Sequence, residues 1–380
     1  MDYGEKALEV HRKNRGKIEI KTKIPLKTKD DLAIAYTPGV AKVSEVIGKN
    51  KQKSYELTNR GNQIAIVSDG TAVLGLGNIG PEAALPVMEG KAAILKEFAN
   101  IDAIPLCINT TDPKEIIKFC KYIEPSFAGI NLEDIAAPRC FEILPQLEKE
   151  LSIPVFHDDQ DGTAIVVLAA LINACRVTGK VMSELKVVVN GAGAAGISIA
   201  RLLLTQNVKD ITMVDSCGVL HNGRCQLDKA KKDIAVKTNK QKTCCGLQEA
   251  MYGRDVFIGV SVGNLVNEKM IKLMNADPII FAMANPTPEV KPGIALRAGA
   301  SIVGTGRSDF PNQINNALVF PGLFKGLLGS KTKKITEKLK IAIAVAIAYS
   351  VKPNKNKILP LLTDRNNVEV IANTIKKFNG

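Results

Sequence analysis

The chain has 380 residues, of which 46% are hydrophobic and 23% charged, and its formal net charge is +13. This length exceeds what one hydrophobic core usually organises, so two domains are expected. The composition excludes a disordered chain, and 4% aromatic residues with no tryptophan leave few stacking platforms for bases, so no nucleic-acid partner is expected.

Segment 1–17 carries charge throughout, unlike a signal peptide, so a cytoplasmic location is expected. The apolar stretches 164–172 and 341–351 are shorter than the roughly 20 residues that cross a bilayer. We therefore predict buried helices and no membrane partner.

The eight cysteines lack CxxC spacing, so reduced thiols are expected. The cluster at Cys217, His221 and Cys225 matches no common zinc-ligand spacing.

From about residue 63, short apolar runs alternate with helix-length segments. The expected strands are 64–67, 103–108, 127–132, 185–189, 211–214, 255–258, 279–282 and 301–303. The expected helices are 81–98, 113–122, 137–150, 163–177 and 193–204, and the chain from 315 onward reads as mainly helical. This alternation predicts an α/β fold with parallel sheets covered by helices.

Two side chains in the first third of the chain are candidates for proton transfer. Tyr36, in AIAYTPGVA, precedes a turn and could serve as an acid. Lys91, in VMEGKAAILKEF, lies in an apolar helical stretch, where a lysine must find a partner or lose its charge. A lysine with a lowered pKa suits a general base. The alternatives are an ordinary half-buried tyrosine ring and a surface lysine with a buried stem.

Two groups of carboxylates follow expected strands. Glu133 and Asp134 stand in GINLEDI, and Asp158, Asp159 and Asp161 stand in VFHDDQDGTA. Clustered carboxylates repel one another and are tolerated when a cation lies between them. Oxygen ligands without histidine or thiol favour Mg²⁺ or Mn²⁺. The alternative is that these acids cap the helices that follow them.

Segment 185–204, LKVVVNGAGAAGISIARLLL, combines a strand, a GxGxxG turn and a helix. Gly191 permits the tight turn, Gly193 lets the backbone approach a pyrophosphate, and Gly196 allows close helix–strand packing. A second strand, ITMVD, ends at Asp215, where it could accept hydrogen bonds from a ribose 2′-hydroxyl and would repel a 2′-phosphate. The pattern predicts a Rossmann-type site for NAD, with NADP as the less favoured cofactor.

Seven segments occur in the order in which they are found in malic enzymes, and the chain resembles the short bacterial type of that family from about residue 31 to about 326. The segments are AYTPGVA, SDGTAVLGLGNIGPEAALPVMEGKAAILKEF, INLEDI, FHDDQDGTA, NGAGAAGISIA, FAMANPTPEV and NQINNALVFPG. The resemblance implies oxidative decarboxylation of (S)-malate to pyruvate and CO₂ with a divalent metal and NAD or NADP. It also implies a homodimer.

The resemblance assigns roles to individual residues. Lys91 matches the base and Tyr36 the acid; Glu133, Asp134 and Asp159 match the metal ligands, with Asp158 beside them as support. The residues that match the cofactor site are Gly191, Ala192, Gly193, Ala194, Ala195, Gly196, Asp215, Ser261 and Asn285. Lys91, Asn285, Asn315 and Asn316 match positions near the substrate.

These matches also imply a domain division. Segment 1–158 is predicted to bind substrate and metal, completed by the helical segment 316–380, and segment 159–315 is predicted to be the Rossmann domain.

The chain departs from the family pattern at two places. Thr71 and Ala72 stand near the position of an arginine that binds a substrate carboxylate in larger malic enzymes, so that contact is unassigned, with backbone amides of segment 75–80 as one candidate. Asp161 stands where short relatives often have histidine.

The sequence leaves two alternative functions. One is a dehydrogenase of a related 2-hydroxy acid without decarboxylation, and the other is a non-catalytic protein that binds nucleic acid through its charge.

Overall fold

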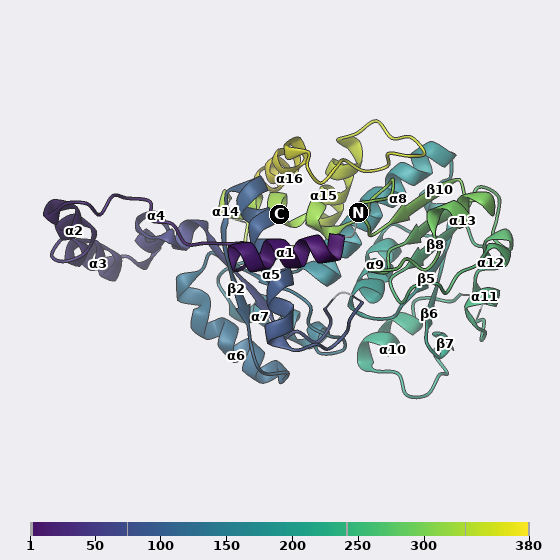
Figure 1. The fold of residues 1–380 in the computed structure, drawn as a ribbon. Coiled ribbons are helices and arrows are strands. Elements are labelled where there is room, and N and C mark those ends of the chain that lie inside the picture. The colour runs from purple at the N-terminus through teal and green to yellow at the C-terminus, as the bar shows by residue number, and fades with distance from the viewer. Residues whose placement is uncertain (1–2, 74, 241, 331, 379–380) are drawn as a thin grey trace.

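The computed structural model describes residues 3–73, 75–240, 242–330 and 332–378. These residues form two β-sheets surrounded by helices, which confirms the predicted α/β class (Figure 1). The first sheet is parallel, in the order β2-β1-β3-β4. Its strands are β1 (Gln63–Ser68), β2 (Asp102–Cys107), β3 (Gly129–Leu132) and β4 (Val155–His157).

Helices cover both faces of this sheet, and alternate residues of β1 show how. Ile64 and Ile66 pack in the hydrophobic cluster that contains the apolar side of α5 (Pro81–Ala99). Ala65 and Val67 pack with α6 (Pro113–Ile123) and α7 (Cys140–Glu150) on the opposite face. A strand buried on both sides reads as a continuous apolar run, which is why this segment was predictable.

The second sheet has the order β10-β9-β8-β5-β6-β7 and is parallel except at its β7 edge. Its strands are β5 (Lys186–Asn190), β6 (Asp210–Asp215), β7 (Gly218–Val219), β8 (Val256–Gly259), β9 (Ile279–Ala282) and β10 (Ile302–Thr305). Its helices are α9 (Ala194–Thr205), α10 (Lys229–Ala235), α11 (Leu247–Ala250), α12 (Glu268–Lys272) and α13 (Pro292–Arg297). The two-residue strand β7 was not predicted, because it is too short to show periodicity.

Helix α8 (Thr163–Thr178) connects the two sheets, after a π-helical turn at Asp158–Gly162. The apolar stretch Asp158–Thr178 has the length and composition of a membrane span, but 78% of its most apolar window is buried inside the fold. It packs against α9 and α15 (Glu337–Tyr349), and Asn173 Nδ2 donates to the carbonyl oxygens of Ala348 and Ile358 at 2.7 and 2.8 Å. The predicted buried helix is therefore a core helix.

The C-terminal part is helical, as predicted. It comprises a 3₁₀ turn at Asn316–Leu318, α14 (Phe320–Leu328), α15 and α16 (Arg365–Lys377). Helices α14 and α16 pack together, and α14 also packs on α5. The end of the chain thus returns to the first sheet.

The N-terminal helices contain no buried residue. They are α1 (Tyr3–Asn14), α2 (Lys29–Ala35), α3 (Val40–Lys49) and α4 (Ser54–Leu57). Figure 1 shows α2 and α3 standing clear of both sheets. We call residues 18–50 the N-terminal arm. Its apolar side chains are exposed, with Ile20 at 95%, Ile34 at 74% and Leu32 at 53%.

Candidate active site

A cleft between the two sheets gathers residues from both halves of the structure. It is bordered by α5, the ends of β3, β8 and β9, the π-helical turn and the 3₁₀ turn. The predicted site residues that line it are Lys91, Glu133, Asp134, Asp159, Ala195, Ser261, Asn285, Asn315 and Asn316. The start of the glycine-turn helix α9 therefore faces the acidic residues across one cavity.

Glu133, Asp134 and Asp159 converge because neighbouring parallel strands end at the same edge of a sheet. Leu132, the last residue of β3, pairs with His157, the last of β4, and the acids follow directly. One carboxylate oxygen from each acid lies within 4.8 Å of the others, and the Asp134 N–H donates to Asp159 Oδ2 at 2.8 Å. Among the described residues this is the one grouping of at least three His, Cys, Asp or Glu side chains with such geometry.

The surrounding protein groups by themselves disfavour the ionised forms of these acids. Burial, followed by repulsion from Asp158, Asp159 and Asp134, raises the pKa of Glu133 well above its usual range, against the opposing charge of Lys91. Burial likewise raises the pKa of Asp158 and Asp159. Burial also lowers the pKa of His157 to about 4, so this neighbour adds no positive charge. A divalent cation with a preference for oxygen fits this donor set.

Lys91 lies in the middle of α5 and points into the same cleft. Its Nζ forms an ion pair with Asp158, lies 3.1 Å from Glu133 Oε1 and donates to Asn316 Oδ1 at 3.3 Å. Phe320 covers it, with the ring centroid 4.9 Å from Nζ. Burial alone lowers the pKa of Lys91, but the charges of Asp158 and Glu133 outweigh it and raise the pKa above its ordinary value. A dication among the same carboxylates would act in the opposite direction.

Asp158 is completely buried, and the π-helical turn shapes its surroundings. Its Oδ2 accepts from Lys91, and its Oδ1 has no hydrogen-bond partner among the described residues. A Cβ at Gly162 would lie 2.0 Å from that Oδ1, so only glycine fits there. The carboxylate thus lies beside the group of Glu133, Asp134 and Asp159 but is not part of it.

The glycine turn has the features that a dinucleotide requires. Gly191 has φ of 118°, and a Cβ there would lie 2.5 Å from the Val260 carbonyl oxygen. A Cβ at Gly196 would lie 1.7 Å from the Gly191 oxygen, whereas the space beside Gly193 is open within 4 Å. Helix α9 begins at Ala194, and no side chain within the described ranges caps its first N–H groups. Those N–H groups and the open face at Gly193 fit a pyrophosphate.

Glu289 is a site residue that sequence reasoning missed. Its buried carboxylate accepts from the Ser261 N–H at 3.0 Å and from the Ala284 N–H at 3.1 Å, and so ties the loops after β8 and β9 together. Asn190 Nδ2 adds a 2.7 Å hydrogen bond to Ser261 Oγ. A single glutamate in PTPEV carries no local signal for this role.

Asp215 ends β6 as predicted, but other side chains contact its carboxylate. Arg224 and Lys231 donate to it, together with the Cys217 N–H. Burial alone raises the pKa of Asp215, and these hydrogen bonds lower it by more.

Tyr36 does not reach the cleft of its own chain. It follows α2 on the N-terminal arm, and 73% of it is exposed.

Three further positions near the cleft differ from what the sequence indicated. Asp161 is separate from the group of Glu133, Asp134 and Asp159, since it pairs with Lys340 on α15, with Nζ and Oδ1 2.6 Å apart. At Thr71, Arg139 Nη2 donates to Oγ1 at 2.9 Å, so an arginine from a different segment reaches this neighbourhood. Lys17 lines the cleft as well, and no local pattern distinguishes it from other lysines.

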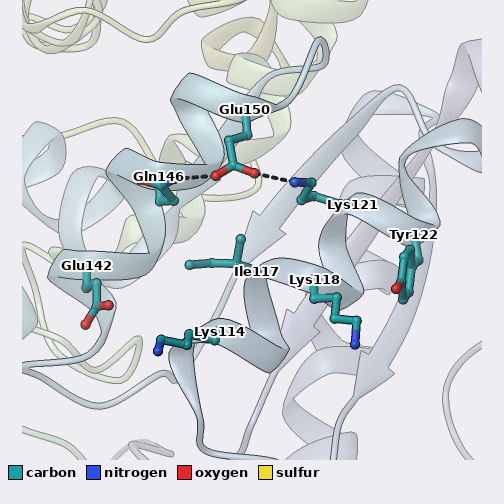
Figure 2. Close-up of a pocket in the computed structure, with 8 residues that line it drawn as sticks. All are labelled: Lys114, Ile117, Lys118, Lys121, Tyr122, Glu142, Gln146 and Glu150. Carbon is teal, nitrogen blue, oxygen red and sulfur yellow. Dashed lines mark hydrogen bonds and ion pairs between the residues drawn. The ribbon is translucent and has the colours of Figure 1, made fainter.

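A second hollow lies on the surface between α6 and α7 (Figure 2). Figure 2 shows Glu150 bridging Lys121 and Gln146 above Ile117. Its lysines and glutamates lie on solvent-facing helix surfaces, as in an ordinary charged surface.

Two models of protein families match the chain. One, described as the malic enzyme N-terminal domain, matches residues 15–114, and the other, described as the malic enzyme NAD binding domain, matches residues 160–378. The bifunctional malic/malolactic enzyme of Bacillus subtilis is 50% identical over 381 residues, covering 99% of this chain and 93% of that protein. The NAD-dependent malic enzyme of Geobacillus stearothermophilus is 49% identical, covering 95% of this chain and 76% of that protein.

Two further comparisons concern cofactor and fold. The NADP-dependent malic enzyme of Escherichia coli is 44% identical over 88% of this chain, which spans 44% of that longer protein. The crystal structure of the NAD-dependent malic enzyme of Thermotoga maritima superposes with a TM-score of 0.94 and 48% identity, covering 98% of this chain and 99% of that one.

Proposed function

The chain belongs to the malic enzyme family, and from this premise we propose that the cleft between its sheets is where the family's reaction takes place. The protein is an NAD(P)-dependent oxidoreductase that decarboxylates (S)-malate to pyruvate and CO₂. The observation that carries the proposal is the meeting of Lys91 and three carboxylates with the dinucleotide turn in one cavity. A dehydrogenase without decarboxylation is not favoured.

Glu133, Asp134 and Asp159 would hold Mg²⁺ or Mn²⁺, and Gly191, Gly193 and the first N–H groups of α9, with Ala192, Ala194, Ala195 and Gly196, would hold the dinucleotide. When bound, the dinucleotide supplies the hydride acceptor, and the cation stabilises negative charge on the substrate oxygens. Lys91 takes the hydroxyl proton of malate, held in place by Asp158 and Asn316. Asn285, Asn315 and Ser261 border the substrate and the nicotinamide.

The metal assignment predicts a ligand-dependent change in stability. Wild-type protein should gain about 2.7 kcal/mol of unfolding free energy when free Mn²⁺ is a hundred times its Kd. Asp159→Asn or Glu133→Gln should lose most of that gain, because a charged ligand is replaced by a neutral one. Thermal unfolding with and without Mn²⁺ measures this.

Glu142→Gln is the matched control for this measurement, since Glu142 is an exposed glutamate on α7 outside the ligand group. Equal Mn²⁺ stabilisation of all four proteins would contradict the assignment.

Tyr36 can act as the acid only if it comes from another copy of the chain, so the proposed assembly is a homodimer. The arm that carries Tyr36 exposes Ile20, Leu32 and Ile34 to solvent. Exposed apolar surface of this kind is typical of a protein–protein interface. In the dimer, the arm of one protomer would lie on the cleft of its partner and bring Tyr36 to the enol carbon that is protonated after CO₂ leaves.

The reaction is tested by incubating the purified chain with (S)-malate, Mn²⁺ and either NAD or NADP. Reduced cofactor and pyruvate should appear in equal amounts. Oxaloacetate as the accumulating product would support the non-decarboxylating alternative, and lactate without net cofactor reduction would indicate a malolactic reaction like the one in the name of the Bacillus subtilis relative. The cytoplasmic location stays a prediction.

A further inference from the structure

The carboxylate of Asp215 has no acceptor site left for a ribose hydroxyl. Its Oδ1 accepts from the Cys217 N–H at 2.9 Å and from Arg224 Nη2 at 2.7 Å. Its Oδ2 accepts from Arg224 Nη2 at 2.9 Å and from Lys231 Nζ at 2.9 Å. A carboxylate has about four lone-pair sites, so these four contacts occupy them. The simple rule that an acid at this position selects NAD therefore does not apply here.

The two cations retain hydrogen-bond donors that Asp215 does not use. Arg224, between β7 and α10, donates once more, from Nη1 to the Gly218 oxygen at 3.1 Å, and a guanidinium has five N–H groups. Among the described residues Lys231 Nζ donates one hydrogen bond, and an ammonium can donate three. Their side chains are 16% and 26% exposed, so a ligand can reach them.

The local charge also favours an anion. Arg224 and Lys231 together outweigh Asp215 by one positive charge. The next acids along the chain are Asp228 and Asp233. The Asp228 carboxylate caps α10 by accepting from the Lys231 N–H at 2.9 Å, and Asp233 is exposed to solvent on the same helix. A phosphate needs donors and positive charge, whereas a hydroxyl donor needs a free acceptor.

We propose that Arg224 and Lys231 form a subsite for the 2′-phosphate of NADP, and that Asp215 is a positioning residue that holds the two cations rather than a selector for NAD. The proposal rests on the proposed dinucleotide site, because the second strand of such a fold ends beside the ribose of the adenosine. It changes the cofactor expected from the sequence: the chain accepts NADP at least as well as NAD.

The test uses nucleotides that correspond to the adenosine half of the cofactor and lack the nicotinamide half. Calorimetric titration of the full chain with 2′,5′-ADP and with 5′-AMP, which differ only in the 2′-phosphate, should show about tenfold or tighter binding of 2′,5′-ADP, because hydrogen bonds to a charged group are the strong ones. Arg224→Gln and Lys231→Met should each remove most of that preference and leave the 5′-AMP affinity within about twofold of wild type. The NADP:NAD ratio of kcat/KM should fall in parallel.

Two further variants separate the alternatives. Lys232→Met removes an equal charge from an exposed neighbour on α10 and should keep the preference, which excludes a general charge effect. Asp215→Asn should leave the 5′-AMP affinity unchanged; a loss of 5′-AMP affinity would show that the acid binds the ribose and would overturn the proposal. Thermal unfolding confirms that each variant is folded.

The outcomes also separate this proposal from the proposed function. If wild-type protein binds neither fragment, the assignment of the dinucleotide site is wrong, and so is the assignment of the 2′-phosphate subsite. If it binds 5′-AMP as tightly as 2′,5′-ADP, and Arg224→Gln changes neither affinity, the subsite alone is wrong.

Discussion

Lys91→Ala is expected to lower kcat for malate decarboxylation by about 10³-fold, within the range of 10² to 10⁴ typical of a lost general base. The ammonium nitrogen lies 3.1 Å from Glu133 and is paired with Asp158, in the cleft that the glycine turn borders. No other lysine donates to these two acids among the described residues. Steady-state kinetics with malate, Mn²⁺ and each dinucleotide measures the loss.

The same change has a structural consequence that must be separated from the chemical one. Removing the lysine leaves two buried carboxylates without their cation, which costs about 3–5 kcal/mol of stability. Lys91→Arg keeps the positive charge but cannot give up a proton at working pH. It should therefore retain most of the melting temperature and still lose activity. Lys96→Ala, on the exposed side of the same helix, serves as the matched control.

Full activity in both Lys91 variants would remove this residue from the mechanism. A loss of activity restricted to Lys91→Ala, with an active arginine variant, would assign Lys91 a structural and electrostatic role only.

Tyr36→Phe and Lys91→Ala are each expected to be inactive alone and to restore activity when they are co-expressed. If the acid comes from the partner's arm, a mixed dimer contains one complete site, with an intact lysine in its own chain and an intact tyrosine from the other. Random pairing makes half of the dimers mixed, so the expected recovery is about a quarter of wild-type activity. Tyr36 is 73% exposed, so loss of its hydroxyl should leave the stability of the separate chain unchanged within about 0.5 kcal/mol.

The control for this experiment co-expresses Lys91→Ala with Lys91→Arg, which cannot form a complete site in any pairing. Differently tagged chains, purified in sequence, isolate the mixed dimer. An inactive mixed dimer would show that Tyr36 either serves its own chain or is not the acid. Light scattering of the wild-type chain should give twice its mass of 40.9 kDa.

The sequence predicted much of the fold because the determining interactions are local or periodic. The strand at 64–67 is a run of apolar residues buried on both faces, and α8 is apolar on all sides because it lies in the core. The predicted strand 127–132 begins only at Gly129, because a 3₁₀ turn at Glu124–Ser126 precedes it. The predicted helix 137–150 likewise begins at Cys140.

The candidate site was predictable to the extent that its residues follow strand ends. Parallel strands end at one edge, so Glu133, Asp134 and Asp159 meet as their positions indicate. The glycine spacing carries its own signal, because Gly191 and Gly196 have no room for a side chain. The resemblance to malic enzymes named the reaction from the same segments.

The sequence by itself therefore determined the fold class, the dinucleotide turn and the acidic cluster, because each depends on residues near one another in the chain or on the common edge of a parallel sheet. Only the tertiary structure decided that Asp215 is held by Arg224 and Lys231, that Lys340 pairs with Asp161, that Glu289 ties two loops together and that Tyr36 lies outside its own cleft. Ion pairs and hydrogen bonds depend on distance in space, and Lys340 is 179 positions from its partner. Side-chain charge is visible in a sequence, whereas the partner that neutralises it is set by packing.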